Sequence, residues 1–214
     1  MDSMQYHEES QLWAQTHFAR ANLGDVRRIH RVVAVAQAMA AHAGHSIPQL
    51  FAQPYEVKAA YNLFKRPEAT PHNLQAGHRE LVREAIHQPG VYLLVEDTTE
   101  MIWPTTQPID GLGPVGGGQA GLQGFHLHSV LALRWPQTAT SRGSRQRPPL
   151  KVLGLCDQHY YVRQPRPQGE RNEDSLACKK RTRESRVWEE AGERLGPAPG
   201  GARWIRVADR GADI

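Results

Sequence analysis

VYLLVEDTTE, residues 91–100, decides the fold, because its apolar residues alternate along the chain and lead to an acid. Side chains of a β-strand repeat their direction every second residue, so the pattern predicts a strand whose buried face ends in a carboxylate. The residues on that face are Val91, Leu93, Val95 and Asp97. RWIRVADRGADI, residues 203–214, repeats the pattern and places Ile205, Val207 and Asp209 on one face.

Asp97 and Asp209 therefore occupy equivalent positions at the ends of two predicted strands. A carboxylate that follows a buried face costs free energy unless it is paired or binds a metal. A strand-end cap or turn residue is the alternative for either acid alone. If the strands are neighbours, the two acids supply what a divalent-metal phosphodiester site needs, and we expect their carboxylates to reach a shared metal.

The composition describes a soluble globular chain of one or two domains. It has 214 residues, of which 39% are hydrophobic and 22% charged. No run approaches the ~18 apolar residues of a membrane span, and the polar start is unlike a signal peptide. The two cysteines, Cys156 and Cys178, form neither a disulfide framework nor a zinc spacing. We therefore expect a cytoplasmic protein with free thiols and no membrane partner.

Basic residues are concentrated in one part of the chain, although the formal net charge is only +4. Clustered Lys and Arg residues indicate a polyanionic partner, with a solvated helix face as the alternative. The cluster consists of Arg142, Arg145, Arg147, Lys151, Arg163, Arg166, Arg171, Lys179, Lys180, Arg181, Arg183 and Arg186.

Residues up to about 67 are predicted to form helices. Asp25 is a suitable N-cap for one helix, and Pro54 is suited to the first turn of the next. The buried side of the first helix is expected to contain Ile29, Val32, Val33, Ala36, Met39, Ala40 and Ala43. The second helix is expected to bury Val57, Ala60, Tyr61 and Phe64, and to expose Lys58, Asn62 and Lys65. Their basic outer sides could lie on a phosphate backbone.

The pattern changes after residue 70. A helix is predicted over residues 72–87, and a charged helix over about 172–195. Strands are predicted at 91–95, 122–133, 150–162 and 204–207, and Gly/Pro-rich loops at 104–121 and 136–149. The order strand, strand, strand, helix, strand favours an α/β fold with a mixed sheet covered by helices.

Several blocks of the chain, in order, resemble the bacterial cut-and-paste insertion-sequence transposases of the Tn-five kind, which use a DDE catalytic triad. Trp13-Ala14 with Phe18 and ANLGDVRR (21–28) resembles their N-terminal DNA-binding signature, and KAAYNLFKRP (58–67) resembles the next helix. The two acidic blocks are VEDTTE (95–100) and VADRGADI (207–214). HSVLAL (128–133) and ESRVW (184–188) fit the strand and helix between them.

The resemblance implies a small all-helical domain that binds transposon ends, residues 1–70, and an incomplete ribonuclease H-like catalytic domain, residues 71–214. It implies double-stranded DNA as the partner and a homodimer in the synaptic complex of the complete enzyme. The DNA-binding candidates are Arg27, Arg28, Arg31, Lys58 and Lys65, which we expect to be exposed.

By the same resemblance, Asp97 and Asp209 are the first two ligands of a two-metal Mg²⁺ or Mn²⁺ site. The third acid of the family is a glutamate on a later helix, and Glu96, Glu100 and Asp213 do not match its position. We therefore expect the chain to stop before that acid and to bind DNA without nicking it. The alternative is a non-catalytic DNA-binding remnant, or an inhibitor of an intact transposase.

Three other motifs could indicate a metal site, a reactive thiol or a phosphate-binding loop. His126 and His128 share one strand face in FHLHS, a spacing also found in zinc hydrolases, with a solvent-exposed sheet face as the alternative. Cys156 follows an apolar run and is expected to be a core thiol. The loop GPVGGGQAG lacks the lysine of a phosphate-binding loop, so it is interpreted as a flexible connection.

Overall fold

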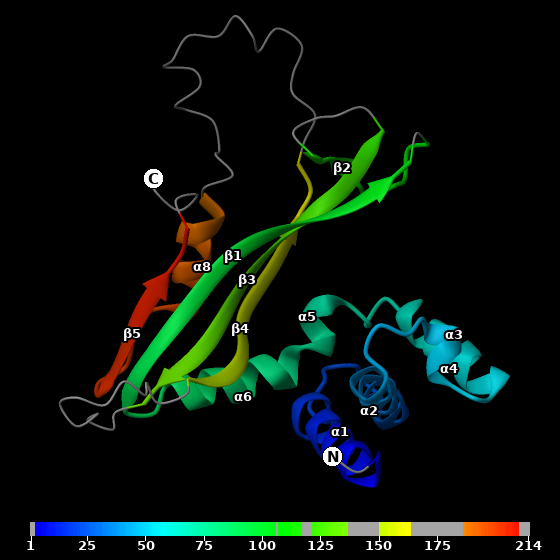
Figure 1. The fold of residues 1–214 in the computed structure, drawn as a ribbon. Coiled ribbons are helices and arrows are strands. Elements are labelled where there is room, and N and C mark those ends of the chain that lie inside the picture. The colour runs from blue at the N-terminus through cyan, green and yellow to red at the C-terminus, as the bar shows by residue number, and fades with distance from the viewer. Residues whose placement is uncertain (1–2, 106, 117–120, 137–149, 164–185, 210–214) are drawn as a thin grey trace, which may run out of the picture. The chain divides into compact units, whose positions relative to one another are not determined.

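The structure is a computed structural model that describes residues 3–105, 107–116, 121–136, 150–163 and 186–209 (Figure 1). The chain divides into two compact units, Met1–Ala85 and Ile86–Ile214, hereafter the helical unit and the sheet unit. Among the described residues, no helix is both long enough and apolar enough to cross a membrane.

Helices alone make up the regular structure of the helical unit. They are α1 (Ser3–Phe18), α2 (Val26–Ala41), α3 (Ile47–Leu50), α4 (Pro54–Phe64), α5 (Pro71–Leu74) and α6 (Ala76–Ile86), of which the last residue belongs to the sheet unit. The carboxylate of Asp25 accepts a hydrogen bond from the backbone N–H of Arg27 at 2.8 Å, so it caps α2 as expected. Pro54 begins α4, where its missing N–H costs no helical hydrogen bond.

The core of the helical unit differs from the prediction at α4 and at the end of α2. Ala60 and Leu63 are the buried residues of α4, whereas Tyr61 is 43% exposed and Phe64 39% exposed. Leu63 joins a cluster of buried residues that consists of Ala21, Leu23, Val32 and Leu63. On α2, Val32, Val33 and Ala36 are buried as expected, but Met39 is exposed.

The helical unit continues past residue 70, where the sequence placed a domain boundary. The backbone N–H of Asn22 donates to the carbonyl of Asn73 at 2.9 Å, and Arg20 lies 3.7 Å from the carboxylate of Glu80. These contacts tie α5 and α6 to the earlier helices, and the observed division falls after Ala85.

A five-stranded mixed sheet forms the sheet unit. Its elements are β1 (Gly90–Pro104), β2 (Gly113–Pro114), β3 (Leu122–Trp135), β4 (Lys151–Tyr161), α8 (Arg186–Leu195) and β5 (Ala202–Val207). β3 is antiparallel to β1, β2 and β4, whereas β5 lies on the other side of β1 and is parallel to it. The expected α/β class, with helices first and a mixed sheet after them, is confirmed.

Two expectations about β1 were wrong. The buried side chains of its first half are Tyr92, Leu94 and Glu96, so the face that carries Asp97 is the more exposed one. The strand also continues to Pro104, because residues 97–104 pair with residues 122–129 of β3. Asp97 therefore lies in the middle of a long strand and not at its end.

Candidate metal and DNA-binding sites

The sheet brings the segments that lead to the two predicted metal ligands side by side. β1 and β5 are paired in parallel, and Val95 lies opposite Val207 in the last pair of the ladder. Asp97 follows that pair by two residues within β1, whereas Asp209 follows it by two residues beyond the end of β5. Both acids are exposed. Adjacent strands are about 4.8 Å apart, a separation at which two carboxylates can share a cation.

Polar groups continue from Asp97 across the sheet on the same face. Ser129 of β3 lies opposite Asp97, and the amide of Gln158 on β4 donates to the Ser129 hydroxyl at 3.0 Å. Carboxylate oxygens suit a hard cation such as Mg²⁺ or Mn²⁺, so the donor set at Asp97 and Asp209 fits the expected metal. Within the described ranges, no group of three or more His, Cys, Asp or Glu side chains could hold a metal ion.

The opposite face carries a buried polar network that the sequence did not reveal. The side chain of Glu96 is fully buried, and Arg206 of β5 forms a double hydrogen bond with its carboxylate, one through Nη2 at 2.7 Å and one through Nε. The same guanidinium donates to the backbone carbonyl of Trp188 in α8 at 2.5 Å. Burial raises the pKa of Glu96, but the hydrogen bonds from Arg206 and His128 outweigh it, and the pKa lies below its usual value.

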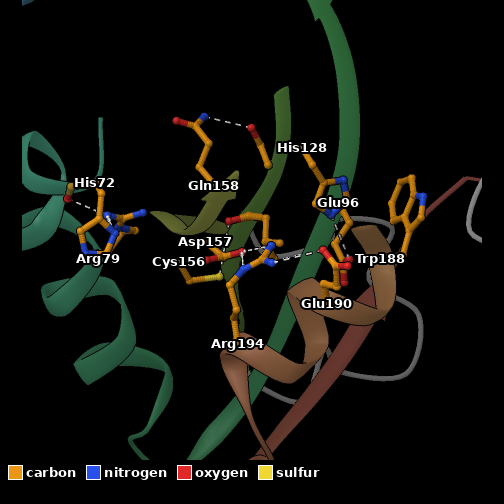
Figure 2. Close-up of polar contacts among 12 residues, drawn as sticks. His72, Arg79, Glu96, His128, Cys156, Asp157, Gln158, Trp188, Glu190 and Arg194 are labelled. Atoms are coloured by element: carbon orange, nitrogen blue, oxygen red, sulfur yellow. Dashed lines mark hydrogen bonds and ion pairs between the residues drawn. The ribbon is translucent and has the colours of Figure 1, made fainter. Parts of the chain in front are cut away.

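His128 extends this network along β3 (Figure 2). Its Nε2 lies 3.6 Å from the Glu96 carboxylate, its Nδ1 is 2.9 Å from the Thr98 hydroxyl, and its ring packs edge-on against Trp188. His126 lies on the same face and pairs with Glu100 at 3.0 Å. The two histidines do share one face, but they are 3% and 0% exposed, so the solvent-exposed alternative was wrong.

α8 is also tied to β4 by an ion pair. Arg194 contacts the Asp157 carboxylate at 2.9 Å and lies 4.0 Å from Glu190, as Figure 2 shows. The neighbouring Cys156 is fully buried, and its thiol donates to the carbonyl of Val130, which confirms a core thiol. Cys178 lies outside the described residues. Of the basic cluster, only Lys151, Arg163 and Arg186 fall within them.

In the helical unit, the DNA-binding candidates separate into two groups. Arg27, Lys58 and Lys65 are exposed as expected. The Arg27 side chain is 87% exposed, and its hydrogen bond to Asp25 lowers the pKa of that carboxyl to about 2. Arg31 is only partly exposed.

Arg28 was wrongly expected to be exposed. Its guanidinium lies 3.0 Å from the Glu68 carboxylate and donates to the carbonyl of Leu23 at 3.0 Å. Only 29% of its side chain is exposed. Arg28 therefore joins the start of α2 to the segment after α4, and its charge is directed into the unit.

The outer side of α4 combines basic and aromatic residues. Tyr55, Lys58, Asn62 and Lys65 are spaced by three or four positions, so they lie on one helix face. All four are exposed, and Tyr55 is 66% exposed. We call this set the α4 stripe. Aromatic residues beside lysines can contact both the sugars or bases and the phosphates of DNA.

Comparison with protein families connects the helical unit to DNA. Residues 10–69 match the family model of the transposase DNA-binding domain. The matched segment contains most of α1, all of α2, α3 and α4, and the α4 stripe. The helical unit is therefore similar to a transposase DNA-binding domain over residues 10–69, and this similarity supports DNA as its partner.

Proposed function

We propose that the chain is a DNA transposase of the cut-and-paste, Tn-five-like kind, which binds the double-stranded ends of a transposon and cleaves them at a DDE site. The match of residues 10–69 to the transposase DNA-binding domain carries this proposal. The pairing of β1 with β5, the two strands that lead to Asp97 and Asp209, supports its catalytic part.

The helical unit would supply DNA recognition. Its α4 stripe presents Lys58 and Lys65 on one exposed face, seven residues apart. Exposed lysines at this spacing can neutralise phosphates along one groove edge, and each such contact makes binding depend on salt. Arg27 pairs with Asp25 but is 87% exposed, so it can contribute a phosphate contact at the start of α2. Arg28 is only 29% exposed and pairs with Glu68, so its role is structural.

The sheet unit would supply the catalytic carboxylates on a ribonuclease H-like sheet. Three successive antiparallel strands, followed by a helix and a strand parallel to β1, agree with that architecture. Asp97 and Asp209 would hold Mg²⁺ or Mn²⁺, and two such ions stabilise both the attacking and the leaving oxygen of an in-line displacement.

The proposed site needs a further acid beyond these two carboxylates. The described residues bring no third His, Cys, Asp or Glu to them. In the family that the chain resembles, this ligand is a glutamate on a later helix, and the complete enzyme acts as a dimer on paired ends. We therefore expect two carboxylates alone to bind a divalent ion weakly, because the charge that offsets repulsion between two ions is reduced.

A paired measurement tests the proposal. Binding of the chain to duplex DNA is measured by fluorescence anisotropy over a salt series, and Mn²⁺ binding by electron paramagnetic resonance. Asp97→Asn should abolish Mn²⁺ binding and leave DNA affinity unchanged. Asp110→Asn removes an exposed carboxylate outside the site and should change neither.

The outcomes separate the candidate functions. DNA binding together with Mn²⁺ binding that needs Asp97 supports the transposase. DNA binding with no effect of Asp97→Asn on Mn²⁺ supports a non-catalytic DNA-binding protein. A chain that does not bind duplex DNA at low salt contradicts both.

A further inference from the structure

β5 has few features that fix its register against β1. It is the last strand on its side of the described sheet, and Arg203, Ile205, Arg206 and Val207 are all exposed. Register is strongly specified only where one face of a strand is buried. Specific side-chain contacts must therefore contribute much of the register of this strand.

Two side chains of β5 provide such contacts. At its start, the indole N–H of Trp204 donates to the carbonyl of Ile86 at 2.9 Å. Near its end, Arg206 reaches the carboxylate of Glu96. The backbone partner of Arg206 is Leu94, so the arginine reaches two residues further along β1 to find its acid. That acid is the residue immediately before Asp97.

α8 has a gap that admits the Arg206 guanidinium. Gly192 lies inside this ten-residue helix, where glycine is unfavourable relative to alanine. A Cβ atom at position 192 would lie 2.6 Å from Arg206 Nη1. The guanidinium is held there by Glu96 and by the Trp188 carbonyl, so it cannot move aside without losing hydrogen bonds. The position of this glycine is explained by the arginine.

We propose that Arg206, held between Glu96 of β1 and the Trp188–Gly192 segment of α8, is the positioning residue that keeps β5 in register with β1 and thereby sets where Asp209, two residues beyond β5, lies relative to Asp97. The inference rests on the proposed function, because metal binding is the reason why the positions of the two acids matter. It assigns Arg206 and Glu96 no contact with DNA or metal, since they lie on the opposite face from Asp97.

A metal site tolerates little error in the register of β5, so a residue that fixes this register matters. A shift of β5 by one residue turns Asp209 to the other face of the sheet, because side chains alternate. A shift by two residues keeps the face but displaces the carboxylate by about 6.6 Å. Paired catalytic ions lie only ~3.5–4 Å apart, so either shift separates the two ligands.

Disulfide trapping measures this register directly and needs neither metal nor activity. In a background with Cys156→Ala and Cys178→Ser, the level pair is Val95→Cys with Val207→Cys, which lie opposite each other in the ladder. The offset pair is Leu93→Cys with Val207→Cys. Opposed residues on adjacent strands meet the Cα separation that a disulfide requires, whereas a pair offset by two residues lies beyond about 7 Å and does not. The ratio of the two oxidation rates reports the register.

Arg206→Met should lower the level-to-offset ratio at least about tenfold, a change in relative population equivalent to about 1.4 kcal/mol. Gly192→Ala should lower it in the same direction by displacing the guanidinium. Arg203→Met, on the same strand but with its side chain on the other face, should leave it unchanged. Val115→Ala, a fully buried residue elsewhere in the sheet unit, should reduce stability without altering the ratio.

The double variant Glu96→Met with Arg206→Met separates positioning from stability. Replacing a buried ion pair by apolar residues often preserves stability. If Arg206 is a positioning residue, the double variant should have a higher melting temperature than Arg206→Met, whereas its level-to-offset ratio should stay as low. A ratio at the wild-type value in Arg206→Met and in the double variant overturns the inference, as does a wild-type background that favours the offset pair.

Failure of the proposed function would look different. The Mn²⁺ and DNA measurements would then fail in the wild-type chain, while the disulfide ratios would still respond to Arg206 and Gly192. The role of Arg206 in fixing β5 and the use of that alignment for metal binding are thus measured separately.

Discussion

The helical unit and the sheet unit differ in the sequence distance over which their candidate sites are assembled. The α4 stripe lies within a single helix, so its face follows from a local spacing. The pair that fixes the two acids, Glu96 and Arg206, joins residues 110 positions apart. A local site can be recognised from one motif, whereas a long-range site depends on pairings that no single segment contains.

The difference has an energetic side as well. In the proposed function, the exposed lysines of the α4 stripe bind DNA, and their loss should leave the fold intact. The carboxylate of Glu96 is fully buried, so the loss of its partner affects the fold directly. Substitutions in the two units should therefore separate binding from stability.

The largest expected effect is that of Arg206→Met on stability. The substitution leaves the fully buried Glu96 carboxylate without its strongest partner. Because the Arg206 side chain is itself 44% exposed, the expected cost is about 2 kcal/mol of unfolding free energy, less than for a fully buried pair. Urea denaturation followed by circular dichroism measures the change. Arg203→Met removes an exposed charge from the same strand and should stay within about 0.5 kcal/mol of the wild type.

The α4 stripe is tested next, by DNA affinity instead of stability. Lys58→Ala and Lys65→Ala should each weaken duplex binding and reduce the log–log salt slope by roughly 0.9, because each removes one phosphate contact. Melting temperatures should hardly change. Arg28→Ala should do the reverse, with a lower melting temperature and an unchanged slope. Equal salt slopes for all three variants would show that the exposed lysines and the partly buried Arg28 contribute equally to DNA binding.

Gly192→Ala should have a smaller effect on stability, and it should destabilise although glycine-to-alanine substitutions inside helices usually stabilise. In an open helix the substitution stabilises by up to about 1 kcal/mol, but here it displaces Arg206 from its hydrogen bonds. We expect a net loss of about 1 kcal/mol. Gly200→Ala is the matched control, because nothing lies within 4 Å of its added Cβ atom. Stabilisation by Gly192→Ala would show that the guanidinium moves aside freely.

The last prediction is a pH dependence of stability in the helical unit. His17 and His78 face each other with their Nδ1 atoms 3.0 Å apart. Burial, followed by the nearby charges of His17 and Arg79, lowers the pKa of His78 from 6.5 to about 4. Between these values the unfolded chain binds the proton and the folded chain does not, so stability should rise as pH increases from about 4 to 6.5 and then level off.

Thermal unfolding of the full chain across that range measures the dependence. His78→Gln should flatten it, because the titrating group is gone. His30→Gln removes an exposed histidine of α2 and should leave the curve unchanged. A stability that falls with increasing pH in this window would contradict the assignment.

Sequence periodicity predicted the elements of the sheet but not its buried face. The run VYLLVE has apolar residues in both phases, so alternation cannot choose between Val91, Leu93, Val95 and the set Tyr92, Leu94, Glu96. α8 lies on the face of the second set, because its Trp188 packs against His128 of β3, which contacts Glu96. A contact between segments so far apart leaves no local signal.

The two acids and the buried pair beside them show the same limit. The equal phase of Asp97 and Asp209 was readable from two short motifs, and the strands that lead to them are paired, whereas a metal shared by the two acids stays a prediction. Glu96 gave no signal, since it was counted with the exposed phase. Arg206 interrupts the apolar run of β5, and a charge at such a position could have indicated a partner across the sheet.

At α4 the prediction failed for a different reason. The helix buries Ala60, as expected, but it buries Leu63 and leaves Tyr61 and Phe64 exposed. Leu63 lies in one cluster with Val32 of α2, so contact with another helix selects this side of α4.

β1 is flanked by strands on both sides only in its first part. Its pairing with β5 ends at Val95, whereas its pairing with β3 continues to Pro104. Beyond Asp97, the described strands cover one edge alone, so every second backbone amide of this segment faces away from a partner. Hydrogen exchange should therefore be slow throughout the first part and alternate between slow and fast residues in the second.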